Sequence, residues 1–147
     1  MNVLRDVSML LVEDDPGHAR LIQKNLRRCG ITNDIIAMGD GRKALDYLFG
    51  EGEYAGQMRA SPLLMLLDLN LPVLDGYQTL VRMREDERTK RIPVIILTTT
   101  DDAREVRRCY ELGCNVYITK PVDYDEFSEA IRKLGLFLSI VAIPDGE

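Results

Sequence analysis

Short apolar runs and amphipathic segments alternate along this chain. In the clearest run, Leu63 to Leu67, apolar residues lead directly into Asp68, and Pro72 prevents the strand from continuing. An apolar run of about four to eight residues before such a breaker is typical of a strand buried on both faces, as inside a parallel sheet. Similar runs, the second of them weaker, predict strands at residues 8–12, 33–38, 63–67, 93–97 and 115–119.

The segments that follow these runs carry helix signals. Asp15 and Pro16 provide an N-cap and a first helical residue for the first helix, and Gly30 ends it. Asp101 or Asp102 caps the fourth helix in the same way. The predicted helices cover residues 16–29, 41–49, 76–85, 103–112 and 123–134.

Strands that alternate with helices predict a single α/β domain, in which a five-stranded parallel sheet carries five helices on its two faces. The length of 147 residues suits one domain. Residues 50–61 contain glycines and no apolar period, which predicts a long loop without the G-x-G-x-x-G pattern of dinucleotide-binding proteins. We interpret this loop either as a contact for a partner or as a tolerated insertion.

Charge and residue content argue against several classes of function. The net charge of -5, with acids and bases interspersed, argues against nucleic-acid binding, which would need a basic face. The cysteines lack metal-binding spacing, and the only histidine, His18, is expected to be exposed or locally hydrogen-bonded, so a zinc site has little support. The longest apolar run, residues 134–143, is too short to cross a membrane. Since we find no secretory signal, we expect a cytoplasmic protein.

Polar side chains follow four of the predicted strands, at the sheet edge where open α/β folds bind ligands. In chain order they are Glu13 and Asp14, then Asp68, Thr98 and Lys120. Taken singly, the acids are equally well explained as helix caps and Lys120 as a surface lysine, but together they predict a site. Carboxylates that crowd together repel, so the cluster must take up a proton or a cation, and an oxygen-only cluster suits Mg²⁺.

Metal, ammonium and hydroxyl are the groups that phosphoryl transfer needs, because this reaction depends mostly on positioning and on neutralising charge. Lys120 can meet an anion, and Thr98 can donate a hydrogen bond. A carboxylate can itself act as the nucleophile and become an aspartyl phosphate. Asp68, alone at the end of the central strand, is the candidate phosphoacceptor.

These residues resemble the receiver domain of two-component response regulators, and the resemblance spans nearly the whole chain. The family's acidic pair, phosphoacceptor, switch hydroxyl and lysine–proline pair correspond to Glu13-Asp14, Asp68, Thr98 and Lys120-Pro121. The resemblance implies a flavodoxin-like, doubly wound sheet with strand order 2-1-3-4-5. It also implies that the peptide bond between Lys120 and Pro121 is cis.

The resemblance further implies the ligands of the metal. Mg²⁺ would be bound by Asp14, Asp68 and the backbone carbonyl of Asn70, while Glu13 would hold a metal-bound water; Mn²⁺ and Ca²⁺ are alternative ions. Asn70 and Thr100 lie where the family tunes hydrolysis of the acyl phosphate, which leaves its lifetime open.

Tyr117 matches the family's switch aromatic, three residues before Lys120. By resemblance, Thr98 turns toward the phosphoryl group and Tyr117 moves inward behind it, a local change of charge that biases a two-state packing element. The alternative interpretation of Tyr117 is a half-buried aromatic residue of a strand.

Three segments look like the small single-domain response regulators that serve bacterial and cyanobacterial phytochromes. They are residues 52–54, 66–72 and 91–99. This likeness implies a sensor histidine kinase, and more narrowly a phytochrome, as the partner. Two features depart from the common pattern: Thr99 replaces a small residue and is expected to crowd phosphoryl access, and residues 113–116 replace the usual small and acidic residues.

We expect a receiver domain at residues 1–134 and an apolar C-terminal extension at 135–147. Without an effector domain, the output would come through protein contacts, dimer formation or phosphorelay to a phosphotransfer protein or downstream target. The extension carries more apolar surface than one helix face can bury, which predicts a homodimer arm with Phe137, Ile140 and Val141 in the interface.

Two other functions are compatible with the same residues. A haloacid-dehalogenase-like phosphatase also forms an aspartyl phosphate, but it needs a second aspartate where this chain has Asn70, and no cap domain is evident. A receiver-like adaptor would bind partners without phosphorylation. The sequence favours a signalling protein that catalyses only its own phosphorylation and dephosphorylation.

Overall fold

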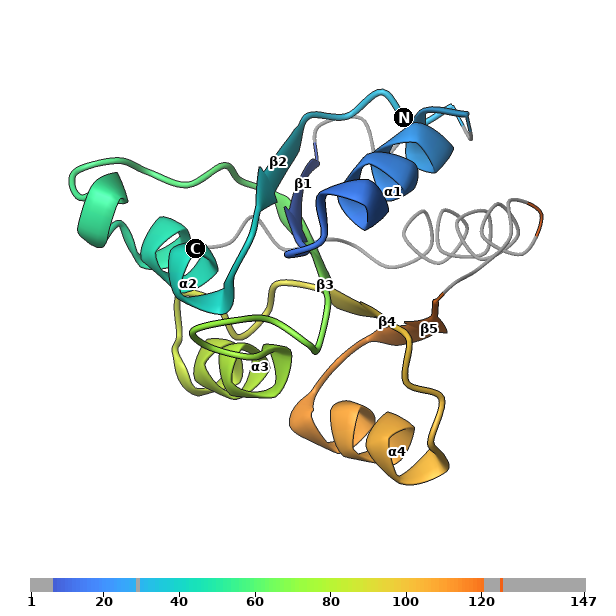
Figure 1. Ribbon diagram of the computed structural model, residues 1–147. Coiled ribbons are helices and arrows are strands. Elements are labelled where there is room, and N and C mark those ends of the chain that lie inside the picture. Colours follow the sequence, from blue (N-terminus) through green and yellow to red (C-terminus); the bar gives the residue numbers. More distant parts are fainter. Residues whose placement is uncertain (1–6, 29, 121–124, 126–147) are drawn as a thin grey trace.

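The computed structural model describes residues 7–28, 30–120 and 125, in which strands and helices alternate (Figure 1). The strands are β1 (Ser8–Val12), β2 (Ile35–Met38), β3 (Leu63–Leu67), β4 (Val94–Thr98) and β5 (Val116–Thr119). The α-helices are α1 (Pro16–Arg28), α2 (Gly41–Phe49), α3 (Gly76–Glu85) and α4 (Ala103–Leu112), and a short 3₁₀-helix, η2, covers Gly52–Tyr54. None of the helices among these residues is long and apolar enough to cross a membrane.

The five strands form one parallel sheet in the order β2-β1-β3-β4-β5, which confirms the predicted topology. All residues of the central strand β3 are buried, which explains its unbroken apolar sequence. The described part of the chain contains four α-helices where five were predicted. The predicted fifth helix at 123–134, the extension at 135–147 and the Lys120–Pro121 bond lie outside the described residues.

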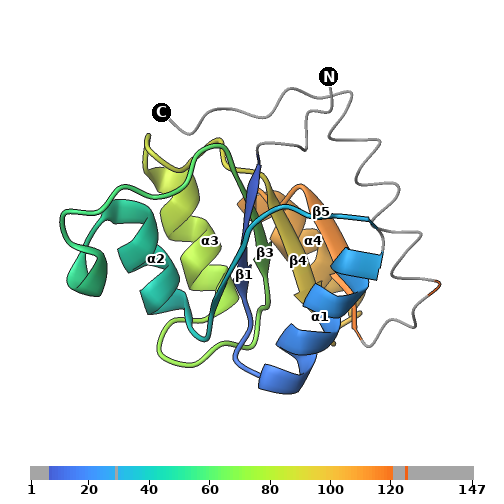
Figure 2. The ribbon, with the colours of Figure 1, turned by 90° about the horizontal axis from the view of Figure 1, so that it is seen from above.

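Successive residues of each strand pack on opposite faces of the sheet, so the protein has two hydrophobic cores. On one face, alternate strand residues such as Leu10 and Met65 pack with buried side chains of α2, α3 and α4. On the other face, Leu11 and Leu66 pack with Ile22 of α1. Figure 2 shows α2 and α3 on one side of the strands and α1 on the other. Each fully buried leucine stabilises this arrangement by roughly 1.5–3 kcal/mol.

The predicted helix caps are present, while three strands differ from their predicted boundaries. Asp40 accepts a hydrogen bond from the N–H of Lys43 at 2.7 Å, and Asp102 rather than Asp101 caps α4. β4 covers Val94–Thr98 rather than 93–97, and β5 begins at Val116 rather than at residue 115. The second strand was predicted from residue 33 but begins at Ile35. Asn33 lies outside the strand, and its side-chain amide donates to the carbonyl of Val7 at 2.7 Å.

The loop at residues 50–61 packs against α2. The rings of Tyr47 and Tyr54 meet edge to face, with centroids 5.3 Å apart. The hydroxyl of Tyr47 also accepts a hydrogen bond from the N–H of Ala60 at 2.8 Å. These contacts show that part of the loop belongs to the packed domain.

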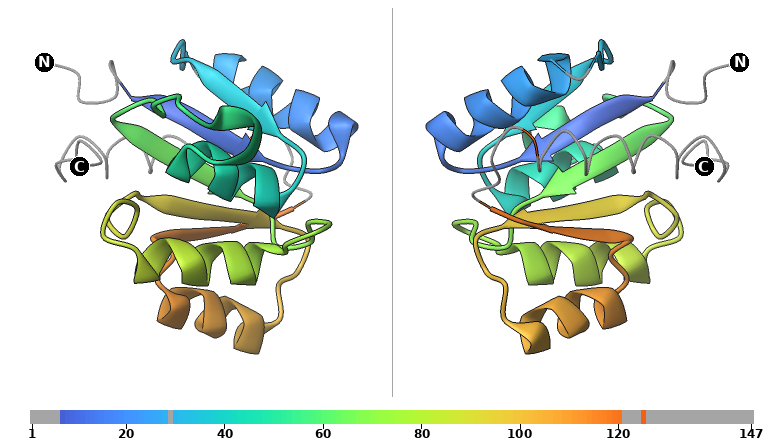
Figure 3. Two further views of the ribbon diagram at one scale, coloured as in Figure 1. Left: turned by 90° about the vertical axis from the view of Figure 1, so that its left-hand side faces the viewer. Right: turned by 90° about the vertical axis from the view of Figure 1, so that its right-hand side faces the viewer.

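The helices α3 and α4 lie side by side on one face of the sheet (Figure 3). Arg84, near the end of α3, connects this helix by hydrogen bonds to the segments that lead into β4 and β5. Its Nη1 donates to the carbonyls of Lys90 at 2.9 Å and Ile92 at 2.8 Å. Its Nε donates to the carbonyl of Gly113 at 3.0 Å, and its Nη2 to the side-chain oxygen of Asn115 at 3.2 Å. One guanidinium therefore satisfies acceptors from two separate loops.

Candidate functional site

Asp68 follows β3 directly and is held at the carboxyl edge of the sheet. Its backbone N–H donates to the carbonyl of Val12 at 3.0 Å, which extends the β1–β3 ladder to this residue. The residue is buried, with only 6% of its surface exposed. The N–H of Asn70 points toward its Oδ1 at 3.4 Å, a long hydrogen bond.

Gly76, the first residue of α3, packs directly against the backbone of Asp68. A Cβ atom at Gly76 would lie 2.4 Å from the carbonyl oxygen of Asp68 and 2.7 Å from the Cα of Leu69. Only glycine permits this approach without displacing the backbone that carries the carboxylate. The predicted helix start at Gly76 was correct, but its spatial role was not visible from the sequence.

Glu13 and Asp14 follow β1 and meet Asp68 across the strand ends. One carboxylate oxygen from each of these three residues lies within 4.8 Å of the other two. Glu13 is buried, whereas Asp14 is exposed. Burial raises the pKa of Glu13; hydrogen bonds from Lys120 and from the backbone N–H of Asp15 oppose that rise, and the neighbouring charge of Asp68 adds to it.

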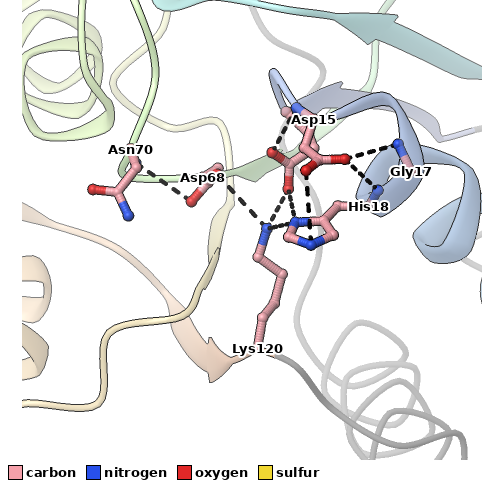
Figure 4. A network of polar contacts seen from close by, with 7 residues as sticks. Asp15, Gly17, His18, Asp68, Asn70 and Lys120 are labelled. Carbon is pink, nitrogen blue, oxygen red and sulfur yellow. Dashed lines mark hydrogen bonds and ion pairs between the residues drawn. The ribbon is translucent and has the colours of Figure 1, made fainter.

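Lys120 follows β5 and directs its ammonium group at the acidic residues (Figure 4). The Nζ atom forms an ion pair with Oε1 of Glu13 and lies 3.6 Å from Oδ2 of Asp68. It also lies 3.4 Å from Nδ1 of His18, the third residue of α1. The lysine is 9% exposed, so its charge is compensated by buried acids rather than by solvent.

Thr98 ends β4 and is fully buried. Its hydroxyl oxygen is the only buried side-chain polar atom without a hydrogen-bond partner among the described residues. Leaving a buried hydroxyl without a partner costs about 1–3 kcal/mol. A ligand oxygen bound at this edge of the sheet could accept a hydrogen bond from Thr98 and remove this cost. The neighbouring Thr99, which was expected to crowd phosphoryl access, is exposed.

Tyr117 lies in β5 and is partly buried. Its hydroxyl donates a hydrogen bond to the backbone carbonyl of Thr100 at 2.5 Å, and burial raises the pKa of Tyr117 to about 12. This position is compatible with both interpretations made from the sequence, the switch aromatic and the half-buried strand aromatic.

The structure therefore brings together residues that are far apart in the sequence, Glu13, Asp14, Asp68 and Lys120, at one edge of the sheet. The predicted dimer residues Phe137, Ile140 and Val141 lie outside the described residues.

Sequence reasoning did not assign His18 to the site. The only available signal was its place in the first turn of the helix that follows the acidic pair.

The donor set at this edge fits a divalent metal ion. Three carboxylate groups supply hard oxygen ligands, and Asp14 is exposed to the solvent that supplies metal-bound water. The described residues offer no thiolate beside these acids, because Cys109 and Cys114 are buried in a core away from them. The site is therefore of the type that binds magnesium or manganese.

Comparison with known proteins identifies the family. Residues 9–132 match the model of the response regulator receiver domain. The chain is 37% identical to the response regulator Rcp1 of Synechocystis sp. over 137 residues, which cover 92% of each protein. The Mn²⁺-bound structure of Rcp1 has a TM-score of 0.79, with 93% of this chain and 98% of that chain covered.

Two further crystal structures are similar. A response regulator receiver domain from Rhodospirillum rubrum is 53% identical, with a TM-score of 0.79 and coverage of 95% of this chain and 99% of that chain. The phosphorylated cyanobacterial phytochrome response regulator RcpA is 36% identical, with a TM-score of 0.80 and coverage of 94% and 98%.

This chain belongs to the response regulator receiver domain family. Its similarity to Rcp1 and RcpA confirms the predicted resemblance to phytochrome-associated response regulators. The similar structures also confirm the flavodoxin-like fold. Receiver domains bind Mg²⁺ at an acidic pocket, and the group formed by Glu13, Asp14 and Asp68 fits such a pocket.

Proposed function

We propose that this protein is a single-domain response regulator of a two-component phosphorelay, which accepts a phosphoryl group from a histidine kinase on Asp68. The observation that carries the proposal is the convergence of unlike groups at one sheet edge. The carboxylate of Asp68 shares a 4.8 Å cluster with two other acids and lies 3.6 Å from the ammonium of Lys120. The unpaired hydroxyl of Thr98 ends the neighbouring strand.

Mg²⁺ is the proposed cofactor, with Mn²⁺ and Ca²⁺ as substitutes. The carboxylates of Asp14 and Asp68 and the backbone carbonyl of Asn70 would bind the ion, and Glu13 would hold one of its waters. When bound, the ion neutralises negative charge on the phosphoryl oxygens. The Mn²⁺-bound structure of Rcp1 supports this proposal.

The protein's own residues divide the chemistry between them. A carboxylate oxygen of Asp68 attacks phosphorus, the bond between phosphorus and the donor's imidazole nitrogen breaks, and the electron pair leaves with the imidazole. Lys120 donates a hydrogen bond to a phosphoryl oxygen and offsets its charge, and the hydroxyl of Thr98 donates a hydrogen bond to another phosphoryl oxygen. The acyl phosphate on Asp68 is thus stabilised by groups from two other strand ends, those of β4 and β5.

The proposed output is a change in protein contacts driven by Thr98 and Tyr117. The protein would be a cytoplasmic signalling protein that catalyses only its own phosphorylation and dephosphorylation. We propose a phytochrome as the sensor kinase because RcpA is a cyanobacterial phytochrome response regulator. Residues 1–134 would form the receiver domain, and residues 135–147 the arm of a homodimer. A phosphotransfer protein or other downstream target would receive the signal.

Phosphotransfer from autophosphorylated histidine kinases, one of them a phytochrome, tests this function. We expect radiolabel to move to the wild-type protein and not to Asp68→Asn. Transfer to the Asp68→Asn variant would place the nucleophile elsewhere. Sustained turnover of a phosphomonoester would instead favour the phosphatase alternative, and partner binding that ignores phosphorylation would favour the adaptor.

A further inference from the structure

We propose that His18 is a positioning residue for phosphoryl transfer, which holds the ammonium of Lys120 beside the carboxylate of Asp68 without letting it bond there. This inference rests on the proposed function and adds to it a residue of α1, the helix that follows the acidic pair. Its basis is the contact between the imidazole Nδ1 and the lysine Nζ, 3.4 Å apart.

The start of α1 fixes His18 at the edge of the site. Asp15 accepts hydrogen bonds at Oδ1 from the N–H groups of Gly17 at 2.8 Å and His18 at 3.1 Å (Figure 4). This cap orders the first turn of the helix. The imidazole is thereby directed at Lys120, with Nδ1 3.8 Å from Oε1 of Glu13 and Nε2 3.9 Å from Oδ2 of Asp15.

The chemistry of the two side chains assigns the direction of this contact. A lysine ammonium carries only donors, so Nδ1 of His18 must be the acceptor and the ring proton lies on Nε2. The Nε2–H then faces the carboxylate of Asp15, which favours the same tautomer. Three groups thus lie around the ammonium of Lys120, namely those of Glu13, His18 and Asp68.

The three neighbours of Lys120 are not equivalent. Glu13 forms a buried ion pair with the ammonium, whereas Oδ2 of Asp68 at 3.6 Å lies beyond ordinary hydrogen-bond distance. His18 engages one N–H on the side of α1, so the lone pairs of Asp68 stay available for attack on phosphorus. The side chain of His18 carries no carboxylate and is 48% exposed, so this contact is the easiest of the three to exchange.

During the reaction, the N–H that His18 had accepted would turn to a phosphoryl oxygen on Asp68. With acetyl phosphate as donor, the bond between phosphorus and the acetyl oxygen breaks, acetate leaves with the electron pair, and no proton needs to move. Without an acceptor at position 18, the ammonium would shift onto Oδ2 of Asp68. A carboxylate bonded in this way is a weaker nucleophile, so labelling becomes slower.

Three substitutions at position 18 distinguish the loss of the hydrogen-bond acceptor from the loss of the ring. Asn places Oδ1 the same number of bonds from Cα as Nδ1 of His, whereas Phe keeps a ring without an acceptor and Ala removes both. With acetyl phosphate and saturating Mg²⁺, we expect His18→Phe and His18→Ala to label about 3- to 10-fold more slowly than wild type. His18→Asn should stay within about twofold of wild type.

The inference would be overturned if acetyl phosphate labelled His18→Phe at the wild-type rate, or if it labelled His18→Asn as slowly as His18→Phe. Either result would leave the proposed function intact. A wild-type protein that acetyl phosphate never labels would overturn both. Urea unfolding of each variant checks that the fold is retained. NMR of the ¹⁵N-enriched, unphosphorylated protein is an independent readout. The His18 ring should show the Nε2–H tautomer, and an Nδ1–H tautomer would contradict the proposed contact.

Discussion

The hydroxyl of Tyr117 bonds to the backbone carbonyl of Thr100, and this contact joins β5 to the connection between β4 and α4. Thr98 lies just before that connection. A movement of Thr98 toward a phosphoryl group would therefore pull on the segment that anchors the Tyr117 ring. The pair gives the proposed switch a physical link between its two members.

Removal of this hydroxyl should weaken the link without removing the phosphoacceptor. We expect Tyr117→Phe to lower the free energy of unfolding by about 0.5–1.5 kcal/mol, the usual net contribution of one hydrogen bond. Labelling of Asp68 by acetyl phosphate should persist in this variant. Urea denaturation and a labelling time course measure the two effects, and a complete loss of labelling would contradict the assigned role.

Gly76 should be required for the geometry of the phosphoacceptor. An alanine Cβ would lie 2.4 Å from the carbonyl of Asp68, so Gly76→Ala must displace the backbone that carries the carboxylate. Because small misplacements of reacting groups are costly, we expect labelling to slow at least about tenfold. Gly39→Ala is a matched control, since its Cβ would meet nothing within 4 Å. Equal labelling rates in the two variants would show that the close approach does not position Asp68.

Val73, in the loop between Asp68 and α3, has a left-handed backbone with φ of 67° and is 79% exposed. A β-branched residue is strained in this conformation by about 1–2 kcal/mol, and glycine is not. We expect Val73→Gly to raise the free energy of unfolding by about 0.5–1 kcal/mol after the added freedom of the unfolded chain is counted. Chemical denaturation measures this change, and a less stable variant would show that Val73 makes compensating contacts.

Arg84 should be among the most important polar residues for stability. Arg84→Ala leaves the carbonyls of Lys90, Ile92 and Gly113 without their guanidinium donor, so we expect a loss of about 2–4 kcal/mol. Arg82→Ala, at an exposed position of the same helix, should change stability by no more than about 0.5 kcal/mol. Similar urea midpoints for both variants would mean that solvent replaces the Arg84 bonds at little cost.

The sequence predicted much of the fold because its signals are local. The apolar run before Asp68 marked the buried central strand, and Asp15 and Asp40 marked helix starts. Since parallel strands share a carboxyl edge, the strand-end positions of Asp68 and Lys120 were enough to predict one shared site.

Other features depend on how distant side chains meet, which no local pattern records. The contact of His18 with Lys120 requires both the α1 cap and the reach of a lysine from β5. The unpaired hydroxyl of Thr98 and the approach of Gly76 to Asp68 likewise follow from packing in three dimensions. The start of β2 at Ile35 rather than at residue 33 is another such feature, since Asn33 lies outside the strand and its side chain bonds to the carbonyl of Val7.

Mass spectrometry of the intact protein after incubation with acetyl phosphate shows whether Asp68 accepts a phosphoryl group. We expect a single added phosphoryl group that requires Mg²⁺, is absent from Asp68→Asn, and is lost on treatment with hydroxylamine, which cleaves acyl phosphates. A protein that stays unmodified with Mg²⁺ present, or a label that persists in Asp68→Asn, would contradict this expectation.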